Sequence, residues 1–132
     1  MFFTKSHRDD QRDVFAFVLG VNGFYEEAEV IRSTGRTLSY WSESDRLAER
    51  CLISKEVATI ERGISCLRQL LEYAYMANTS RLIVHYNIAR LAAAKGDNAL
   101  ANDHIKLARK GKHAVIEKRI AFDSNLTKVA KV

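Results

Sequence analysis

Residues 81–110 read RLIVHYNIARLAAAKGDNALANDHIKLARK, and this stretch predicts two helices joined by a tight turn. Gly96 separates them, because glycine adopts the left-handed backbone that ends a helix at little cost, and Asp97 is of the type that caps a following helix. Small side chains recur at helical spacing with larger apolar ones beside them: Ala89, Ala92, Ala93, Ala101 and Ala108, next to Ile88, Leu91, Ile105 and Leu107. Small residues let two helix backbones approach closely, so the stretch predicts a close helical pair.

The same end signals divide the rest of the chain. Serine, aspartate and asparagine mark helix starts, and glycine or asparagine marks helix ends. We expect about seven helices, over residues 7–20, 24–33, 42–52, 54–77, 81–95, 98–110 and 113–122, with a loop at 34–41 and a frayed end after 123. Proline is absent, which removes the commonest helix breaker. The predicted fold class is therefore all-α.

Composition predicts one small globular domain over residues 1–132, with 47% hydrophobic and 28% charged residues. The longest apolar run, residues 14–21, is too short to cross a bilayer. No apolar stretch of signal-peptide type opens the sequence, so we expect a cytoplasmic protein without a membrane partner. Cys51 and Cys66 have no second cysteine or histidine at zinc spacing, and both are predicted to be buried thiols.

Positive charge is concentrated in the C-terminal quarter. The formal net charge is +5, and residues 101–132 carry the whole excess. The candidate basic patch comprises Lys106, Arg109, Lys110, Lys112, Lys118 and Arg119. Such a patch either contacts phosphates or an acidic partner, or forms an ordinary solvated face. A small nucleic-acid-binding regulator is accordingly the alternative function, although Phe122 alone offers a ring for base stacking.

The pair at 82–115 resembles a tetratricopeptide repeat, a helix-turn-helix unit of about 34 residues. The first-helix pattern of that family falls on His85, Ile88, Ala89 and Ala92, and the second-helix pattern on Ala101, Ile105 and Ala108. An ordinary bundle of six or seven helices with an accidental alanine face is the competing interpretation.

Two further units complete the resemblance. The unit at 9–42 has Phe15, Ala16 and Leu19 followed by GFYEEA at 23–28, but it departs from the family at Arg32, where a large apolar residue is expected. Val30 and Ile31 would then turn inward, or the helix would end early. The unit at 41–74 places Leu47, Ala48 and Cys51 against Ile60, Ile64 and Leu67, with Lys55 at the turn where the others have glycine.

The resemblance implies three antiparallel hairpins stacked as a short right-handed solenoid, with residues 113–132 as a capping helix and frayed tail. It also implies a concave groove that receives a peptide or helix of another protein. Carried across by position, the groove residues are Asp13, Phe17, Asp45, Glu49, Tyr86 and Arg90. The function expected from it is a non-enzymatic protein-binding module, such as an adaptor, inhibitor or chaperone, with self-association through an exposed end as a further expectation.

We find no residue pattern that requires a cofactor or a metal, and we expect no enzyme. The glycines form no phosphate-binding loop, and no two histidines have metal-ligand spacing on a helix. Arg81 with His85, and Arg109 with His113, lie four residues apart, one short of the arginine–histidine spacing of some helical ribonucleases. His85 falls at a packing position of the repeat, which favours a buried or half-buried ring, whereas His104 is predicted at the surface.

Overall fold

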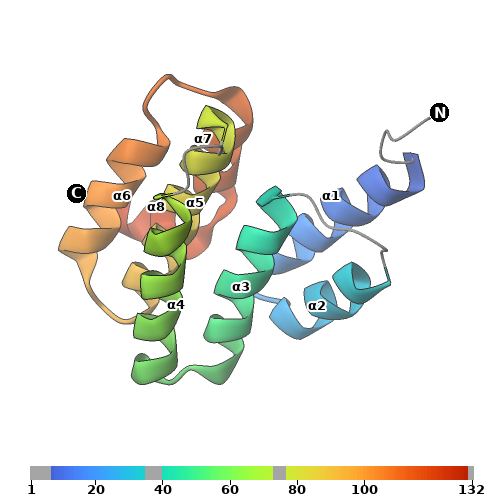
Figure 1. The fold of residues 1–132 in the computed structure, drawn as a ribbon, viewed down its shortest axis with the longest axis horizontal. Helices are drawn as coiled ribbons and strands as arrows, with labels where there is room; N and C mark the ends of the chain where they lie inside the picture. Colours follow the sequence, from blue (N-terminus) through green and yellow to red (C-terminus); the bar gives the residue numbers. More distant parts are fainter. Residues whose placement is uncertain (1–6, 35–39, 73–76, 131–132) are drawn as a thin grey trace.

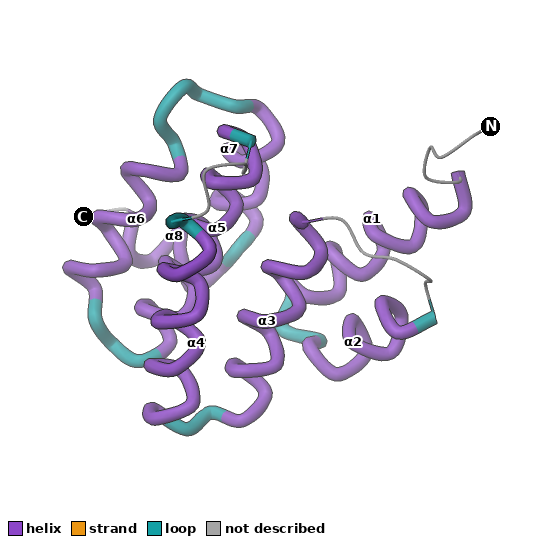
Figure 2. The backbone as a smooth tube through the Cα atoms, in the orientation of Figure 1, coloured by secondary structure: helices purple, strands orange, loops and turns teal. Residues whose placement is uncertain are grey.

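The computed structural model describes residues 7–34, 40–72 and 77–130, and every regular element in these ranges is a helix. Eight helices follow one another there: α1 (His7–Val21), α2 (Tyr25–Ser33), α3 (Tyr40–Ser54), α4 (Val57–Leu70), α5 (Asn78–Ala94), α6 (Asn98–Ala108), α7 (Ala114–Phe122) and α8 (Ser124–Ala130). Figures 1 and 2 show their arrangement. The prediction of an all-α chain is confirmed for these ranges, with one helix more than expected.

Consecutive helices pack in neighbouring pairs, α1 with α2, α3 with α4 and α5 with α6. Helix α3 also contacts α1, α2 and α5, so the middle pair joins the other two. In Figure 1 the pair α1–α2 lies at one end of the molecule, and α6 and α8 lie at the other. This order places α3 between α1 and α5.

The short turns inside the three pairs share one backbone region. Gly23, between α1 and α2, has a φ of 89°, and Gly96, between α5 and α6, has a φ of 86°. Lys55 adopts the same left-handed region between α3 and α4, with a φ of 60°, although its Cβ makes that conformation costly. Asp97 caps α6 as predicted, because its carboxylate accepts a hydrogen bond from the amide of Leu100 at 3.0 Å.

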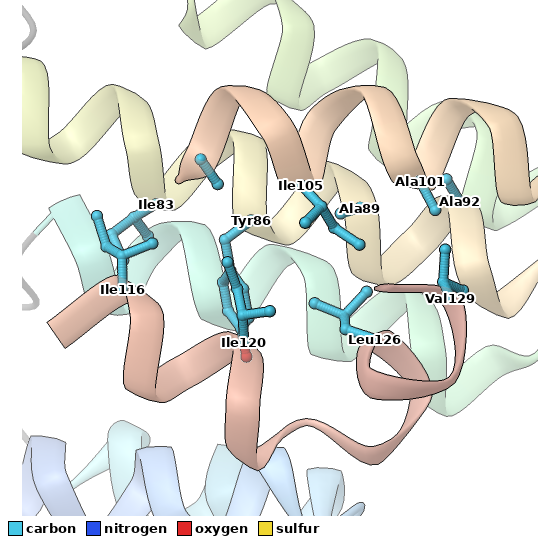
Figure 3. Packing of buried hydrophobic residues seen from close by; sticks show 11 residues of the cluster. Ile83, Tyr86, Ala89, Ala92, Ala101, Ile105, Ile116, Ile120, Leu126 and Val129 are labelled. Atoms are coloured by element: carbon cyan, nitrogen blue, oxygen red, sulfur yellow. The ribbon is translucent and has the colours of Figure 1, made fainter. Parts of the chain in front are cut away.

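The alanines of residues 81–110 lie inside the α5–α6 pair. Ala89 and Ala92 of α5 and Ala101 of α6 are fully buried in one apolar cluster. The other side of this cluster is formed by apolar residues of α7 and α8, which Figure 3 shows reaching toward the pair: Ile116, Ile120, Leu126 and Val129. Burial of one such aliphatic side chain stabilises a fold by about 1.5–3 kcal/mol, so α7 and α8 are integral to the structure.

A second apolar cluster joins α3, α4 and α5. It contains Ala48, Cys51, Leu52, Ile60, Ile64, Leu67, Val84, Ile88 and Leu91. Gly63 of α4 lies at the closest approach, where an added Cβ would lie 2.6 Å from Cys51 Sγ and 3.0 Å from Leu91 Cδ1. Close packing therefore explains a glycine inside α4, which costs a helix about 1 kcal/mol relative to alanine.

The predicted helix 54–77 is wrong at both ends. Ser54 does not cap it, because it is the last residue of α3 and its hydroxyl donates to the carbonyl of Cys51 at 2.8 Å. Glu56 takes the N-cap position without a side-chain hydrogen bond, and α4 ends at Leu70.

Other predicted boundaries also shift. Helix α3 begins at Tyr40, inside the expected loop, and α5 begins at Asn78, which was expected to separate two helices. The predicted fraying after residue 123 is wrong for the described residues, since α8 follows and buries Leu126 and Val129. The amide of Leu126 donates to Asp123 Oδ1 at 3.4 Å, so Asp123 starts a helix as well as ending one.

Candidate functional site

Positions predicted to line a groove meet in the interior of the molecule. Phe17, Asp45, Glu49, Tyr86 and Arg90 belong to one connected set of contacts, whereas the side chain of Asp13 lies outside the described residues. Four of them are at most 3% exposed, namely Asp45, Glu49, Tyr86 and Arg90, and Phe17 is half-buried. The four buried positions are therefore closed to a partner in this conformation, whereas Phe17 remains partly exposed.

Three arginines and three carboxylates form what we call the ion cluster. Its members are Arg32 of α2, Arg90 of α5, Arg119 of α7, Asp45 and Glu49 of α3, and Asp123 between α7 and α8. Each is at most 6% exposed. The formal charges balance, as they must, because an unpaired buried charge costs several kcal/mol.

Arg32 is the residue that departs from the repeat pattern, and the cluster explains it. The prediction that Val30 turns inward in its place is wrong, because Val30 is 62% exposed and Arg32 is 2% exposed. Arg32 can occupy the inward position because the carboxylates of Asp45 and Glu49 on α3 compensate its charge there. Its Nη1 donates to Glu49 Oε1, and its Nη2 lies 4.0 Å from Asp45 Oδ2.

Glu49 ties several helices together. It accepts from Arg32, and its Oε2 lies 3.0 Å from Nη1 of Arg90. A Cβ added to Gly20 of α1 would lie 2.2 Å from Glu49 Oε2, so the carboxylate occupies the space that a side chain at position 20 would need. Arg90 Nη2 also donates to the Gly20 carbonyl at 3.4 Å. One carboxylate thus connects α1, α2, α3 and α5.

Asp45 fastens α7 to the rest of the molecule. Arg119 Nη1 donates to both oxygens of this carboxylate, at 2.8 and 2.9 Å, and Asn87 Nδ2 donates to Oδ1 at 2.9 Å. The guanidinium of Arg119 lies 4.4 Å from the ring centroid of Phe17 and 5.5 Å from that of Tyr86. A cation over an aromatic face is attracted to it, so Arg119 also contacts α1 and α5.

Asp123 completes the cluster from the turn between α7 and α8. Its Oδ2 lies 3.2 Å from Nε of Arg90 and accepts from the hydroxyl of Tyr86 at 3.4 Å. Sequence reasoning missed Asp123 as a member of the cluster and Asn87 as a hydrogen-bond partner of Asp45 and Arg90. Asn87 carried a signal, because it is a polar residue among mostly apolar ones in the stretch 82–93. Asp123 carried none, since a helix-terminating acid is ordinarily exposed.

Asp45, Arg90 and the neighbouring Tyr86 have pKa values shifted by their surroundings. Burial by itself raises the pKa of Asp45, but the charges of Arg119, Arg90 and Arg32 outweigh it and hold the pKa of that carboxyl below its ordinary value. Burial lowers the pKa of Arg90, yet Tyr86 and the neighbouring carboxylates raise it well above its ordinary value. Burial raises the pKa of Tyr86, which keeps its proton. None of these three groups exchanges a proton near pH 7.

The predicted basic patch is divided by the structure. Lys106, Arg109, Lys110, Lys112 and Lys118 are exposed. Arg119 is 6% exposed, so its assignment to the patch is wrong. Successive residues of a helix point about 100° apart, so Arg119 is directed toward α3 while the preceding residue, Lys118, is exposed. Arg109 pairs with Glu117, with Nη2 and Oε1 3.0 Å apart. The nucleic-acid alternative stays a prediction that rests on the five exposed side chains.

Three further features of the described residues concern metal ions, membranes and thiols. The described residues hold no group of three or more His, Cys, Asp or Glu side chains placed to bind a metal ion. None of the helices in the described ranges is long and apolar enough to span a membrane. Cys51 is buried as predicted, but Cys66 is exposed, which corrects the prediction of two buried thiols.

His85 of α5 and His104 of α6 lie against each other. Nδ1 of His85 lies 2.9 Å from Nδ1 of His104, and the two rings stack with their centroids 5.1 Å apart. His85 is half-buried as predicted, whereas His104 is 9% exposed, so its predicted surface position is wrong.

Exposed apolar side chains gather on the α1–α2 pair. Of the nine large hydrophobic residues that are exposed in the described ranges, five belong to this pair: Val14, Phe15, Val18, Phe24 and Val30. Their exposed fractions run from 46% to 62%. Val14 and Val18 lie one turn apart on α1, and Phe15 lies beside them on the same face. We call these five residues the N-terminal apolar surface.

Comparison with known proteins adds no relative. No model of a protein family matches the chain, and neither a curated protein nor a solved structure matches it. What the protein does has to be inferred from its own residues.

Proposed function

We propose that this chain is a non-enzymatic protein-binding module, of the adaptor, inhibitor or chaperone type, which binds a helix of another protein on the N-terminal apolar surface. In this proposal the three helix pairs form a short tetratricopeptide-like stack. The observation that carries it is the contrast between the two ends of the chain. Apolar residues of α7 and α8 cover the α5–α6 pair, whereas Val14, Phe15 and Val18 of α1 are exposed.

A stack of helical pairs buries each apolar face against the next pair, and its terminal faces need a cover of their own. Helices α7 and α8 supply that cover at one end through Ile116, Ile120 and Leu126. Clusters of exposed apolar residues on a folded protein are typical of interaction sites. A partner helix that buries Val14, Phe15 and Val18 would gain the hydrophobic free energy that the isolated chain forgoes.

Charge beside the surface indicates the chemistry of the partner. Glu26 and Glu27 of α2 are exposed. Glu29 is already paired, because Arg46 donates two hydrogen bonds to its Oε1, at 2.6 and 2.8 Å, and Arg50 donates a third at 2.6 Å. The carboxylates of Glu26 and Glu27 therefore suit an amphipathic helix whose apolar face is flanked by lysine or arginine.

The ion cluster gives this surface a rigid support. Arg32 of α2 and the Gly20 carbonyl of α1 are both held from the interior, by Glu49 and Arg90 respectively. A surface that is ordered before binding loses less conformational entropy when the partner docks. The buried polar network thus serves binding by positioning α1 and α2.

The experiment is affinity purification of the tagged full chain from its native cell extract, followed by binding measurements with the purified partner. The variant Val14→Glu/Val18→Glu places two charges on the surface. A matched control, Val57→Glu/Val115→Glu, places two charges on equally exposed valines of α4 and α7. Both sites are solvent-exposed, so both variants should keep the circular dichroism and thermal midpoint of the wild type to within a few degrees.

We expect the wild type and the control to retain a protein that contains a basic amphipathic helix. The Val14→Glu/Val18→Glu variant should bind it at least about tenfold more weakly, because two buried valines carry more than 1.4 kcal/mol of binding free energy. Equal binding by all three proteins would refute the proposed surface. Concentration-dependent self-association that the variant alone abolishes, without a heterologous partner, would replace the partner helix by a second copy of the chain.

A further inference from the structure

Helix α7 has a second apolar face, which is exposed. Val115 and Phe122 are 45% and 63% exposed. Side chains three, four or seven residues apart lie on one side of a helix, so Val115, Lys118 and Phe122 share this face. The opposite side of α7 buries Ile116 and Ile120 in the apolar cluster of α5 and α6 (Figure 3). Helix α7 is therefore apolar on two sides, and the chain itself covers one of them.

The exposed face of α7 adjoins the N-terminal apolar surface through one contact. The guanidinium of Arg119 lies 4.4 Å from the ring centroid of Phe17, which joins α7 to α1. Arg119 lies one helical turn from Val115 and from Phe122 on α7, and Phe17 lies one turn from Val14 on α1. Exposed apolar side chains therefore stand on both sides of this contact, and α1 and α7 contribute to one surface.

The two edges of this surface carry opposite charges. On α2, Glu26 and Glu27 are exposed and lie one turn from Val30, a member of the N-terminal apolar surface. On α7, the exposed Lys118 lies one turn from both apolar residues of the exposed face. Helix α1 contacts both α2 and α7. The surface therefore runs from an acidic edge on α2, over apolar α1, to a basic edge on α7.

We propose that this surface binds a second copy of the chain in a dimer with twofold symmetry. A surface with one acidic edge, an apolar centre and one basic edge is complementary to itself. Rotation by 180° places the acidic edge of each copy opposite the basic edge of the other and brings the apolar centres together. The basic helix considered under the proposed function complements the α2 edge alone, whereas a second copy complements both edges.

The dimer and the proposed function share α1 but differ at α7. The dimer is the form that the chain takes without its partner, and a partner helix on α1 would displace the second copy. Val115 and Phe122 take part in the dimer only. A variant changed at these two residues therefore separates the two proposals, because it loses the dimer and keeps the partner.

Sedimentation velocity of the purified full chain tests the dimer, from roughly micromolar to roughly millimolar concentration, the range of dissociation constants of small interfaces. We expect the average mass to rise from that of one chain to that of two and no further, because a twofold interface is closed. The variants Val14→Glu/Val18→Glu and Val115→Glu/Phe122→Glu should each stay monomeric over the whole range. Circular dichroism should show that both remain folded, since the changed side chains are exposed.

A matched control places two charges on exposed apolar side chains outside the surface. Val57→Glu/Leu107→Glu changes residues of α4 and α6 that are 54% and 41% exposed. This control should dimerise like the wild type, because neither residue belongs to the α1, α2 and α7 surface.

Charge reversal tests how the two copies are oriented. Lys118→Glu alone and Glu26→Lys/Glu27→Lys alone should each weaken the dimer by about tenfold or more, because like charges then face each other at both edges. An equimolar mixture of the two variants should form a heterodimer about as tight as the wild-type dimer, since both edges again join opposite charges. Both variants keep a positive formal net charge, so general charge attraction does not explain such a recovery.

Several outcomes would overturn the dimer. A wild-type chain that stays monomeric at roughly millimolar concentration would do so and would leave the partner proposal standing. Dimers that survive Val115→Glu/Phe122→Glu would exclude α7 from the interface, and masses beyond two chains would replace the twofold dimer by a head-to-tail assembly. Failure of the mixed charge variants to associate would contradict the assigned edges. The predicted dimer without any captured partner would support this inference and refute the proposed function alone.

Discussion

Arg119 and Asp45 lie 74 residues apart in the sequence, yet Arg119 Nη1 donates to both oxygens of the Asp45 carboxylate, at 2.8 and 2.9 Å. The pair joins α7 to α3 across the molecule, and both side chains are buried. Such a contact specifies where the C-terminal helices lie more than it stabilises the fold, because desolvation offsets much of the attraction. Removing only one partner of the pair is strongly destabilising, because the other charge then stays buried without compensation.

The first prediction concerns this pair. Arg119→Met should lower the free energy of unfolding by about 3–5 kcal/mol, because it leaves a buried carboxylate without its bidentate partner. Urea denaturation followed by circular dichroism measures the change. Lys118→Met, at the exposed neighbouring position, should stay within about 0.5 kcal/mol of the wild type. Equal stability of the two variants would show that Arg119 is exposed in solution.

A second prediction concerns Gly20. Gly20→Ala improves the helix propensity of α1 by about 1 kcal/mol, but its Cβ would lie 2.2 Å from Glu49 Oε2 and displace that carboxylate from Arg32 and Arg90. We expect a net loss of about 1–3 kcal/mol in unfolding free energy. Ser65→Ala, at an exposed position inside α4, should instead leave stability unchanged or raise it by a few tenths. A more stable Gly20→Ala variant would contradict the close approach of Glu49.

A third prediction follows from the strained turn at Lys55. Lys55→Gly relieves a side chain held at a φ of 60°, and it should stabilise the chain by about 0.5–1 kcal/mol after the added entropy of the unfolded state is subtracted. Lys95→Gly is the control, because Lys95 ends α5 at a φ of −89° and gains nothing from glycine. Thermal melts of both variants measure the difference. No gain at position 55 would mean that the turn is not left-handed.

The sequence predicts the α5–α6 pair well, because alanines at helical spacing and a Gly96–Asp97 turn are local signals. The resemblance to tetratricopeptide repeats assigns Asp45, Glu49, Tyr86 and Arg90 to a partner-binding groove, whereas the structure buries these four side chains in one set of contacts. What it does not predict is that these positions are closed over. That depends on Arg119, which reads as part of a basic surface because local charge density says nothing about a partner 74 residues away.

Helix ends likewise divide into those that local residues predict and those that depend on contacts between distant residues. Gly23 and Gly96 predict their turns through glycine's conformational freedom. Lys55 has no such signal, so the predicted helix 54–77 begins before α4 does. The extra helix α8 depends on burial of Leu126 and Val129 against α5 and α6, which is a tertiary effect. The sequence does not predict the N-terminal apolar surface either. An apolar residue in a helix is ordinarily expected to be buried, and only the packing of the folded chain shows that these five are exposed.

A fourth prediction concerns acid. Burial, with His104 and Arg81, lowers the pKa of His85 to about 4, whereas its ordinary value is 6.5. The unfolded chain therefore binds this proton more readily, so the contribution of His85 is complete above pH 6.5 and is lost as the pH falls toward 4. Because the ring is only half-buried, solvent screening reduces the loss to about 1–2 kcal/mol.

Urea denaturation from about pH 7 down to about pH 4 measures this loss, and His85→Gln, which cannot titrate, should show a shallower decline. The depressed pKa of Asp45 acts only at lower pH, where its carboxyl becomes protonated and the pairing with Arg119 is lost. Parallel declines in the wild type and in His85→Gln would contradict the burial of His85.

The most direct test of the binding proposal is hydrogen–deuterium exchange of the full chain with and without its captured protein partner. The account predicts that complex formation protects the amides of α1 and α2, around Val14, Val18 and Val30, and leaves α4 and α6 unchanged. Protection centred on α4 or α6, with α1 and α2 exchanging as in the free chain, would contradict it.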